Sequence, residues 1–373
     1  KIKVLDFTRL IPGPGGARLL ADMGAEVTKV EDSKRPDTIN DYPPYEFDGE
    51  SSLSILVNLH KKRLCLDFSH KKAKAILKEI IKNSDVLLES FRPGVMKRYG
   101  LDAKTLHRIN PKLIYVSIPG YGKNSNLSHQ AGHDLNFMAV SGMLNLFTNS
   151  NQSLQKTLPS YPFADFVGGG LMAAMKIVLA LYERNLGKRK IYIDHGMVEN
   201  LVELHPELLT RQKLPFEMLS GTLARYHVYS AIGGELFALA ALEDKFWHVF
   251  CKKADVPHLS HIGFDAKKNK KAITELEKLF KQNTAQFWRN FCKKNDVCLT
   301  PVQNKTDLQK QGYLKPITIQ CGTKKIKGAI NKTETRKQAK YAKKCQDSVA
   351  ILKKLGYSAK EIKTMQLEKI IGE

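Results

Sequence analysis

Two short glycine-bearing segments hold the residues of this chain that are best suited to acid–base chemistry. His133 follows Gly132 in segment 131–137, and Asp165 precedes the glycines at 168–170. Both residues lie where a loop or strand passes into an expected helix, and such junctions place side chains at the mouth of a pocket. The neighbouring glycines let a ligand come close to the backbone. A histidine and an aspartate in these positions can supply a general acid and a general base.

Each of these residues also has an ordinary structural interpretation. A histidine after a glycine in a loop is often a turn or capping residue. Asp165 would serve equally well as the N-cap of a helix that starts at Gly168. Glu243, a third candidate, precedes an expected helix, where an acidic residue is favourable without any chemistry. Taken singly, none of the three identifies a site.

The elements that position these residues alternate between strand and helix over the first two hundred residues. Strands joined by single helices predict an α/β fold, with a mostly parallel sheet covered on both faces. The expected strands are 4–7, 27–31, 86–89, 113–118 and 190–194, and the expected helices are 16–23, 72–82 and 169–184. Residues 12–15, Pro-Gly-Pro-Gly, are interpreted as a helix breaker.

The later part of the chain predicts a second, smaller α+β domain. Residues 225–230 and 236–240 flank Gly233 and Gly234, which indicates a hairpin. We expect a large domain over 1–200 and 330–373, a linker or long helical crossing over 201–225, and the small domain over 226–329. Helices are expected over 245–253 and 274–294, and a closing helix over 347–355 is expected to return to the large domain.

Composition excludes several classes of protein. The formal charge of +23 comes mainly from lysines spread along the chain, and no aromatic residues alternate with them, so we expect a solvated surface and no nucleic-acid partner. No apolar run is seen to approach the roughly 18–20 residues of a membrane helix, so no membrane association is expected.

The six cysteines form no CxxC pair. This predicts reduced thiols, a cytoplasmic location and no metal site. The termini suggest no signal peptide, peroxisomal tag or retention tag.

A set of motifs along almost the whole chain resembles one family. The chain is similar to the family III CoA-transferases and, within them, to the α-methylacyl-CoA racemases. The resemblance implies a Rossmann-like large domain, a small domain and an interlocked homodimer. The motifs that carry it are 9–14, 20–27, 64–67, 91–94, 119–122, 131–137, 164–170, 241–243 and 299–302.

The resemblance also implies roles for single residues. His133 and Asp165 match the two acid/base positions of the racemases, and Glu243 matches the carboxylate that pairs with the histidine. In the transferases, the aspartate that matches Asp165 is the nucleophile, and the position of His133 is usually not histidine. We therefore expect an enzyme that epimerises 2-methylacyl-CoA thioesters. A CoA-transferase that moves CoA between carboxylic acids through Asp165 is the alternative.

The chemistry agrees with this assignment. A proton alpha to a thioester carbonyl is acidified by enolate formation, and a positioned base with a pKa near neutrality can remove it. Inversion needs a second acid on the opposite face of the enolate. His133 with its partner Glu243 and the separate Asp165 supply such a pair.

The resemblance implies a CoA-binding region on the large domain, with CoA as part of the substrate and no tightly bound cofactor. Arginines and lysines near loops suit the phosphates of CoA. After the second strand this chain has Asp32, which would repel a phosphate, so Lys34 or Arg35 would take over the contact. Asp134 itself is interpreted as structural. The expected contact residues are Lys34, Arg35, Cys65, Leu66, Asp67, Phe68, Arg92, Gly132, Asp134 and Phe137.

Overall fold

The computed structural model describes residues 1–46, 49–147, 158, 160–205, 219–331 and 338–372. The chain divides into two units. The first comprises Lys1–Leu144, Pro159–His205 and Pro316–Glu373, and the second comprises Asn145–Leu158 and Pro206–Lys315. The chain therefore returns to the first unit near residue 316, earlier than the expected boundary at 330. Of the expected linker, residues 206–218 lie outside the described residues.

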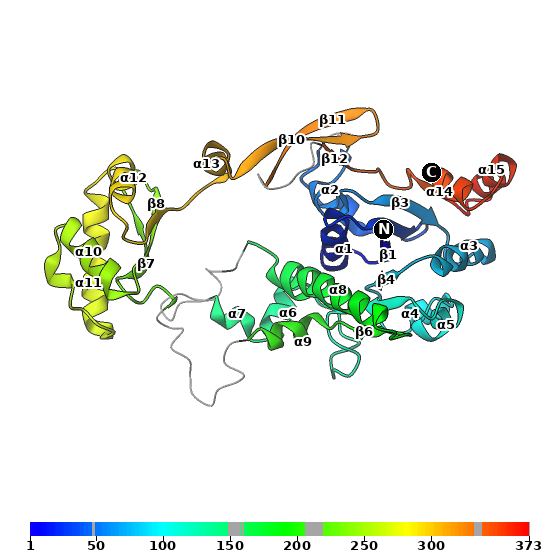
Figure 1. Ribbon diagram of the computed structural model, residues 1–373, viewed down its shortest axis with the longest axis horizontal. Helices are drawn as coiled ribbons and strands as arrows, with labels where there is room; N and C mark the ends of the chain where they lie inside the picture. Colours follow the sequence, from blue (N-terminus) through cyan, green and yellow to red (C-terminus); the bar gives the residue numbers. More distant parts are fainter. Residues whose placement is uncertain (47–48, 148–157, 159, 206–218, 332–337, 373) are drawn as a thin grey trace. The chain divides into compact units, whose positions relative to one another are not determined.

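A six-stranded parallel sheet forms the centre of the first unit (Figure 1), with the strand order β3-β2-β1-β4-β5-β6. The predicted α/β class with a parallel sheet is confirmed. Strand β3 was missed because its Lys-Arg start does not resemble a buried strand, yet Arg63 is buried there against Glu31, 2.7 Å away. The strands are β1 (Lys3–Asp6), β2 (Glu26–Asp32), β3 (Lys62–Leu66), β4 (Val86–Glu89), β5 (Ile114–Ser117) and β6 (Tyr192–Asp194).

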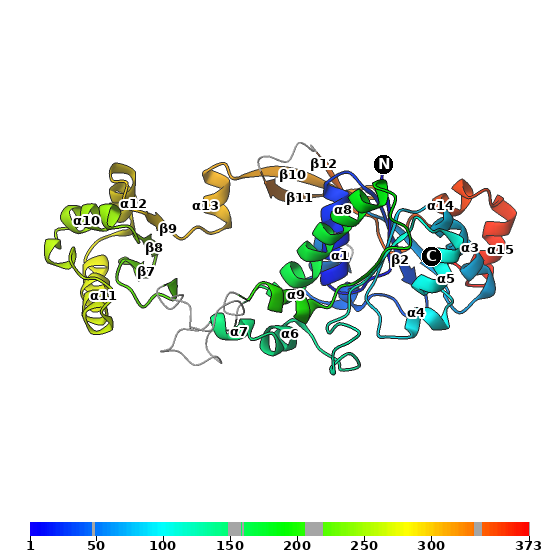
Figure 2. The same ribbon diagram turned by 60° about the horizontal axis from the view of Figure 1, so that its bottom comes forward.

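Helices cover both faces of this sheet (Figure 2). Val4 and Val86 face one hydrophobic core together with residues of α1 and α8. Leu5 and Leu87, one position further along each strand, face the other core, because successive strand residues point to opposite faces. The first face carries α1 (Pro12–Asp22) and α8 (Met172–Asn185), and the second carries α3 (Lys71–Lys82), α5 (Ala103–Ile109), α14 (Ser348–Lys354) and α15 (Ala359–Leu367).

Helix α1 begins at Pro12, four residues before its expected start. The prediction that Pro-Gly-Pro-Gly breaks the helix is wrong, since a proline in the first helical turn removes no intrahelical hydrogen bond. Helix α8 is preceded by a π-helical turn, η4 (Ala164–Leu171), which the sequence analysis did not foresee. A Cβ on Gly16 would lie 2.7 Å from the carbonyl oxygen of Gly170, so α1 and η4 touch backbone to backbone.

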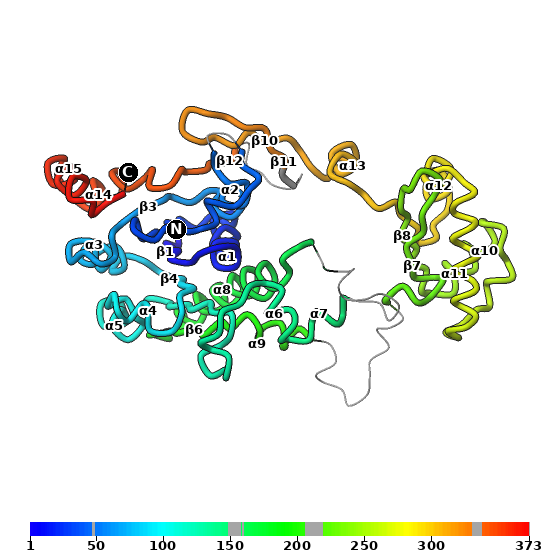
Figure 3. The backbone as a smooth tube through the Cα atoms, turned by 180° about the vertical axis from the view of Figure 1, so that it is seen from behind, coloured from blue at the N-terminus to red at the C-terminus, as the bar shows by residue number. Residues whose placement is uncertain are grey.

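The C-terminal segment lies beside β3 (Figure 3), where Leu66 bridges Ile371. Cys65 on β3 and Cys345 form a disulfide, with their Cα atoms 4.9 Å apart. The expectation of reduced thiols is therefore wrong for this pair, because folding brings together two cysteines 280 residues apart. A small sheet in the order β11-β10-β12 precedes this segment, with β10 (Leu314–Cys321), β11 (Lys324–Asn331) and β12 (Gln338–Lys340).

The second unit contains a three-stranded antiparallel sheet with helices packed against it. The predicted hairpin is confirmed, with Tyr226 opposite Ala240. The single helix expected over 274–294 is instead two helices, because Thr284 caps the start of the second one. Trp288 stacks on Phe280, with ring centroids 3.9 Å apart, in the core of this unit. The elements are β7 (Tyr226–Ser230), β8 (Leu236–Ala240), β9 (Leu299–Pro301), α10 (Asp244–Lys253), α11 (Ala266–Lys281), α12 (Ala285–Lys294) and α13 (Lys305–Lys310).

One helical run of the described chain, Ala164–Asn185, is long and apolar enough to cross a membrane by length and composition. The expectation that no apolar run approaches this length is therefore wrong. The most apolar window of the run is 56% buried inside the protein, and a helix in a protein core meets the same criteria.

We expect Cys345→Ser to lower the free energy of unfolding by about 2–4 kcal/mol, because the disulfide restricts the unfolded chain. Urea unfolding without reductant measures the change. Cys292→Ser is the matched control, since Cys292 is unpaired and half-buried. A titration that finds six free thiols in the denatured, unreduced protein would contradict the disulfide.

Candidate active site

The turn η4 presents Asp165, and two buried side chains hold that turn. Such turns are rare and frequently lie at functional sites. His195 Nε2 lies 3.0 Å from the carbonyl oxygens of Gly168 and Gly169, and Asn200 Nδ2 donates to Gly168 at 2.9 Å. Burial lowers the pKa of His195 to about 4, so the imidazole is neutral and donates from Nε2. Asp165 is thus part of the turn itself and not the N-cap of a later helix.

Close packing leaves no room for side chains at the end of this turn. A Cβ on Gly169 would lie 2.5 Å from Cβ of Pro12 and 2.9 Å from the sulfur of Met197. Helix α9 (Met197–Glu203) and α1 both pack against η4. The glycines therefore allow η4 to pack closely against α1 and α9, and this packing sets the position of Asp165.

The carboxyl of Asp165 has an unusual acidity. Burial, followed by the charge of Asp134, raises the pKa of Asp165 from 3.8 to about 7. Asp134 Oδ1 accepts a hydrogen bond from the backbone N–H of Asp165 at 2.8 Å, and burial raises its own pKa as well. A carboxyl with a pKa near 7 is present in both protonation states at neutral pH, so it can act as an acid or as a base.

His133 is exposed and occupies the N-cap position of α6 (Asp134–Val140). Its backbone N–H donates to Oδ1 of Asn136 at 3.1 Å. The capping position agrees with the structural interpretation of this residue, but His133 also lines a cavity of about 290 Å³. Gly132, Phe137 and Arg92 line the same cavity, so the structure brings four predicted site residues together.

Phe137 occupies space that two glycines leave open. A Cβ on Gly120 or Gly132 would lie 2.3 or 2.7 Å from its ring. Tyr121 meets this ring edge to face, with centroids 5.4 Å apart. The loop before α6 is therefore held by an aromatic contact, and α6 packs against η4 through the same helix start that carries His133 and Asp134. A short helix, α7 (Met143–Leu146), follows α6.

Glu243 belongs to the second unit, whereas His133 and Asp165 belong to the first. Glu243 is exposed and is the N-cap residue of α10. Its pairing with the histidine stays a prediction.

Three of the expected CoA contacts, Lys34, Arg35 and Asp67, lie at the carboxyl ends of β2 and β3. Lys34 Nζ is 2.8 Å from Asp67 Oδ2, and the Lys34 side chain remains 63% exposed. Arg35 Nε is 3.8 Å from Asp32 Oδ2, which offsets the charge that would repel a phosphate. This edge therefore carries two exposed cations, and the third expected cation, Arg92, follows β4.

Three other expected contacts point into the protein. Cys65, Leu66 and Phe68 are buried, Cys65 is bonded to Cys345, and Phe68 packs on Phe7 with ring centroids 5.7 Å apart. A ligand at this place would touch their backbone and not their side chains. Within the described residues no group of three or more His, Cys, Asp or Glu side chains could hold a metal ion.

His195 and Asn200 were not found from the sequence. A lone buried histidine carries no spacing signal, and only the contact with the carbonyl groups of η4 reveals its role. Glu199 was interpreted as a fold residue, and its carboxylate accepts the backbone N–H of Gly122 at 3.0 Å.

A family model for CoA-transferase family III matches residues 1–330. The chain belongs to CoA-transferase family III. Human alpha-methylacyl-CoA racemase is 34% identical over 313 residues, which cover 81% of this chain and 76% of that protein. The acetyl-CoA:oxalate CoA-transferase of Acetobacter aceti is 28% identical over 312 residues, covering 80% of this chain and 79% of that protein.

Solved structures agree with the fold. A CAIB/BAIF family protein from Brucella suis superimposes with a TM-score of 0.78 at 22% identity, covering 95% of this chain and 98% of that one. This family III protein is therefore an enzyme of a group that includes both racemases and CoA-transferases.

The raised pKa of Asp165 predicts that the free energy of unfolding depends on pH. Between pH 4 and 7 the folded enzyme keeps a proton that the unfolded chain has lost, so stability falls as the pH rises. We expect Asp165→Asn to remove this cost and to stabilise the protein by about 2–4 kcal/mol more at pH 8 than at pH 4. Urea unfolding at both pH values measures it. Asp255→Asn, at an exposed position, is the control, and an equal effect of Asp165→Asn at both pH values would refute the shift.

Proposed function

We propose that this enzyme epimerises 2-methylacyl-CoA thioesters by removing the alpha proton and returning it to the opposite face. The observation that carries the proposal is the position of Asp165 in η4, where Asp134 Oδ1 accepts its backbone N–H at 2.8 Å and where burial and Asp134 raise the pKa of Asp165 to about 7. An epimerase must take a proton with one group and give a proton with another, then reverse the roles for the other enantiomer. A carboxyl that is half protonated at neutral pH suits both directions.

His133 would be the second acid/base group. It lines the cavity in front of α6, and the residue after it, Asp134, is hydrogen-bonded to the backbone of Asp165. The two acid/base residues are thereby linked through one helix start, and an enolate would lie between them. Glu243 would orient the imidazole and stabilise its charged form. The 34% identity to a human alpha-methylacyl-CoA racemase supports this assignment.

CoA would enter as part of the substrate and would not be tightly held between turnovers. The exposed cations Lys34 and Arg35 at the end of β2, with Arg92 after β4, suit its phosphate groups. Around residues 65–68 the contact would be to the backbone, because the side chains of Cys65, Leu66 and Phe68 are buried. We propose no nucleic-acid partner and a cytoplasmic location, although a disulfide is uncommon there.

A CoA-transferase is the second candidate, favoured by the 28% identity to a CoA-transferase of Acetobacter aceti. In that reaction the Asp165 carboxylate would attack the thioester carbonyl of the donor and form an anhydride with release of CoA thiolate. The thiolate would then attack the aspartyl carbonyl, which frees the donor carboxylate and leaves CoA on Asp165 as a thioester. The acceptor carboxylate would attack this thioester, and the released thiolate would attack the acyl carbonyl of the new anhydride, which forms the acceptor's CoA thioester and restores Asp165. His133 has no required part in these steps, whereas epimerisation needs it.

We also propose a homodimer. Helix α8 exposes a stripe of apolar side chains on the isolated chain, with Met175, Leu179 and Tyr182 each 57–61% exposed. Their spacing places them on one face of the helix, and Leu171 and Leu186 extend the stripe at both ends. A contiguous apolar stripe of this length is typical of a protein–protein interface. The resemblance to interlocked dimers agrees with a second copy as its partner.

We expect His133→Ala and Asp165→Asn each to slow alpha-proton exchange about 10²–10⁴-fold while CoA binding persists. The measurement is deuterium uptake into 2-methylacyl-CoA in deuterated water without any carboxylate acceptor, followed by mass spectrometry. His129→Ala, at a position outside the proposed pair, is the control. If wild type shows no exchange, and hydroxylamine traps an anhydride on Asp165 in the presence of a carboxylate acceptor, the transferase is correct.

We expect Leu179→Lys to convert the dimer into monomers, because a lysine on the α8 stripe would bury its charge at the interface. Sedimentation equilibrium measures the mass. Leu367→Lys is the matched control, since Leu367 is 76% exposed on α15 and lies outside the stripe. A wild-type protein that is monomeric at micromolar concentrations would refute the dimer.

A further inference from the structure

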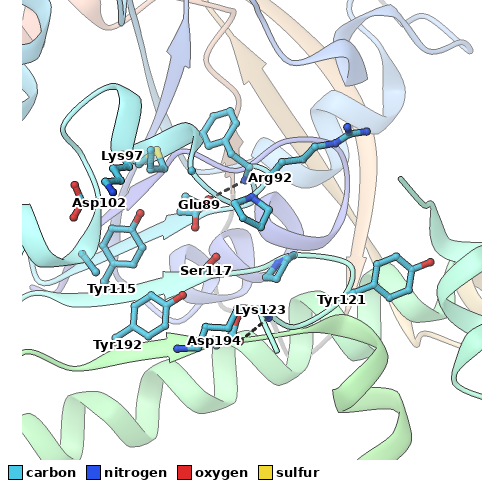
Figure 4. Close-up of a pocket in the computed structure, with 16 residues that line it drawn as sticks. Glu89, Arg92, Lys97, Asp102, Tyr115, Ser117, Tyr121, Lys123, Tyr192 and Asp194 are labelled. Carbon is cyan, nitrogen blue, oxygen red and sulfur yellow. Dashed lines mark hydrogen bonds between the residues drawn. The ribbon is translucent and has the colours of Figure 1, made fainter. Parts of the chain in front are cut away.

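A second cavity lies beyond the carboxyl ends of β4, β5 and β6, beside the cavity of His133. Its volume is about 240 Å³, and the last residues of the three strands, Glu89, Ser117 and Asp194, line it. It shares Arg92 and Tyr121 with the neighbouring cavity, but neither His133 nor Asp165 lines it. Figure 4 shows the carboxyl of Glu89, Ser117 and the hydroxyl ends of Tyr115 and Tyr192 around one space.

Glu89 forms the buried end of this cavity. It is only 6% exposed, and its Oε2 accepts the backbone N–H of Phe91 at 2.8 Å. Burial raises the pKa of Glu89 to about 7, against the opposing effect of hydrogen bonds from the Ser117 side chain and the Phe91 backbone and with the aid of the charge of Asp194. No ion pair to Glu89 is found among the residues that the structure describes. A buried carboxyl without a cation is one that a positively charged ligand would stabilise.

Asp194 has an oxygen that lacks a partner. Its Oδ2 accepts the backbone N–H of Lys123 at 2.9 Å, whereas its Oδ1 is buried with no hydrogen bond among the described residues. A buried acceptor without a donor costs about 1–3 kcal/mol. This second, independent observation indicates a hydrogen-bond donor that belongs in the cavity.

The side of the cavity is aromatic and already attracts a cation. Tyr115 and Tyr192 stack with ring centroids 5.8 Å apart, and Nζ of Lys123 lies 4.8 Å from the centroid of the Tyr192 ring. Ring faces of this kind attract ammonium groups. Phe91 and Met96 add apolar surface.

We propose that this cavity binds a small organic cation, a protonated primary amine with a short apolar body. The ammonium group would donate to Glu89 and to the free oxygen of Asp194, and the apolar body would lie against the rings. An ammonium group has three donors and no acceptor, which matches the acceptors at this end of the cavity. A metal ion fits less well, because the described residues offer no cluster of three ligating side chains.

The other charges around Glu89 do not replace this ligand. Arg92 turns its guanidinium group away from Glu89 (Figure 4). Lys97 and Asp102, at the entrance beside Tyr115, are of opposite charge, and Lys123 lies over Tyr192 next to Asp194. Glu89 therefore remains the buried carboxyl of this cavity without an ion-pair partner among the described residues, although the whole chain carries a formal charge of +23.

Amine binding should depend on pH through Glu89. The ammonium group binds the ionised carboxylate, and with a pKa of about 7 the ionised fraction rises about tenfold from pH 6 to pH 8. The amine itself stays protonated across this range. Affinity should therefore increase about tenfold with pH, and binding near pH 7 should release protons from the enzyme.

The experiment uses n-pentylamine as the probe in isothermal titration calorimetry with the full chain, in phosphate buffer because Tris is itself an amine. We expect n-pentylamine to bind at least tenfold more tightly than 1-pentanol or pentanoate, and about tenfold more tightly at pH 8 than at pH 6. Equal affinity for the amine and the alcohol, or affinity that does not change with pH, would overturn the proposal.

Two variants test the residues. Glu89→Gln keeps an acceptor for Phe91, and Asp194→Asn keeps one for Lys123, so both preserve the existing hydrogen bonds. Each should weaken amine binding at least tenfold at pH 8, and Glu89→Gln should also abolish the pH dependence. The control is Glu368→Gln, because Glu368 is an exposed carboxylate directly after α15. This variant should bind the amine like wild type. If Glu89→Gln keeps wild-type affinity, the proposal fails, whatever the reaction at Asp165 is.

Discussion

The backbone contact between α1 and η4 is the constraint on which the candidate site depends. Gly16 and Gly170 meet where a Cβ would lie 2.7 Å from a carbonyl oxygen, and Gly169 fits between Pro12 and Met197. At this contact η4 forms a π-helical turn, and the turn places Asp165 beside the start of α6, where Asp134 accepts the backbone N–H of Asp165. His195 and Asn200 hold the turn from the other side through the carbonyl groups of Gly168 and Gly169.

Two kinds of environment surround the carboxyl groups in the first unit. Asp6 lies 2.7 Å from Lys61, and the pKa of Asp6 is lowered because the charges of Lys61 and Lys29 outweigh its burial. Glu89 is buried and Asp165 is half-buried, and neither has a cationic partner among the described residues, so desolvation raises the pKa of each to about 7. Paired carboxylates stabilise the fold across the physiological range, whereas unpaired ones remain available to a proton or a ligand.

Both of these unpaired carboxyl groups lie where chain segments pass from one element to the next. Glu89 is the last residue of β4, and Asp165 lies in the turn that leads into α8. In a parallel sheet the strand ends gather at one edge, and this edge is where open α/β folds bind ligands. Within the second unit, Glu243 also lies at a junction between elements, the start of a helix after an antiparallel hairpin.

The sequence by itself determined the fold class and the hairpin of the second unit, and it nominated the residues proposed to carry the chemistry. These follow from local patterns: apolar strands at regular intervals, two glycines between two strands, and a histidine and an aspartate beside glycines. The tertiary structure decided the rest. Strand β3 and the Cys65–Cys345 disulfide depend on partners far away in the chain. The acidity of Asp165 and Glu89 also depends on burial, because desolvation is set by every element that surrounds a carboxyl and not by its neighbours in sequence.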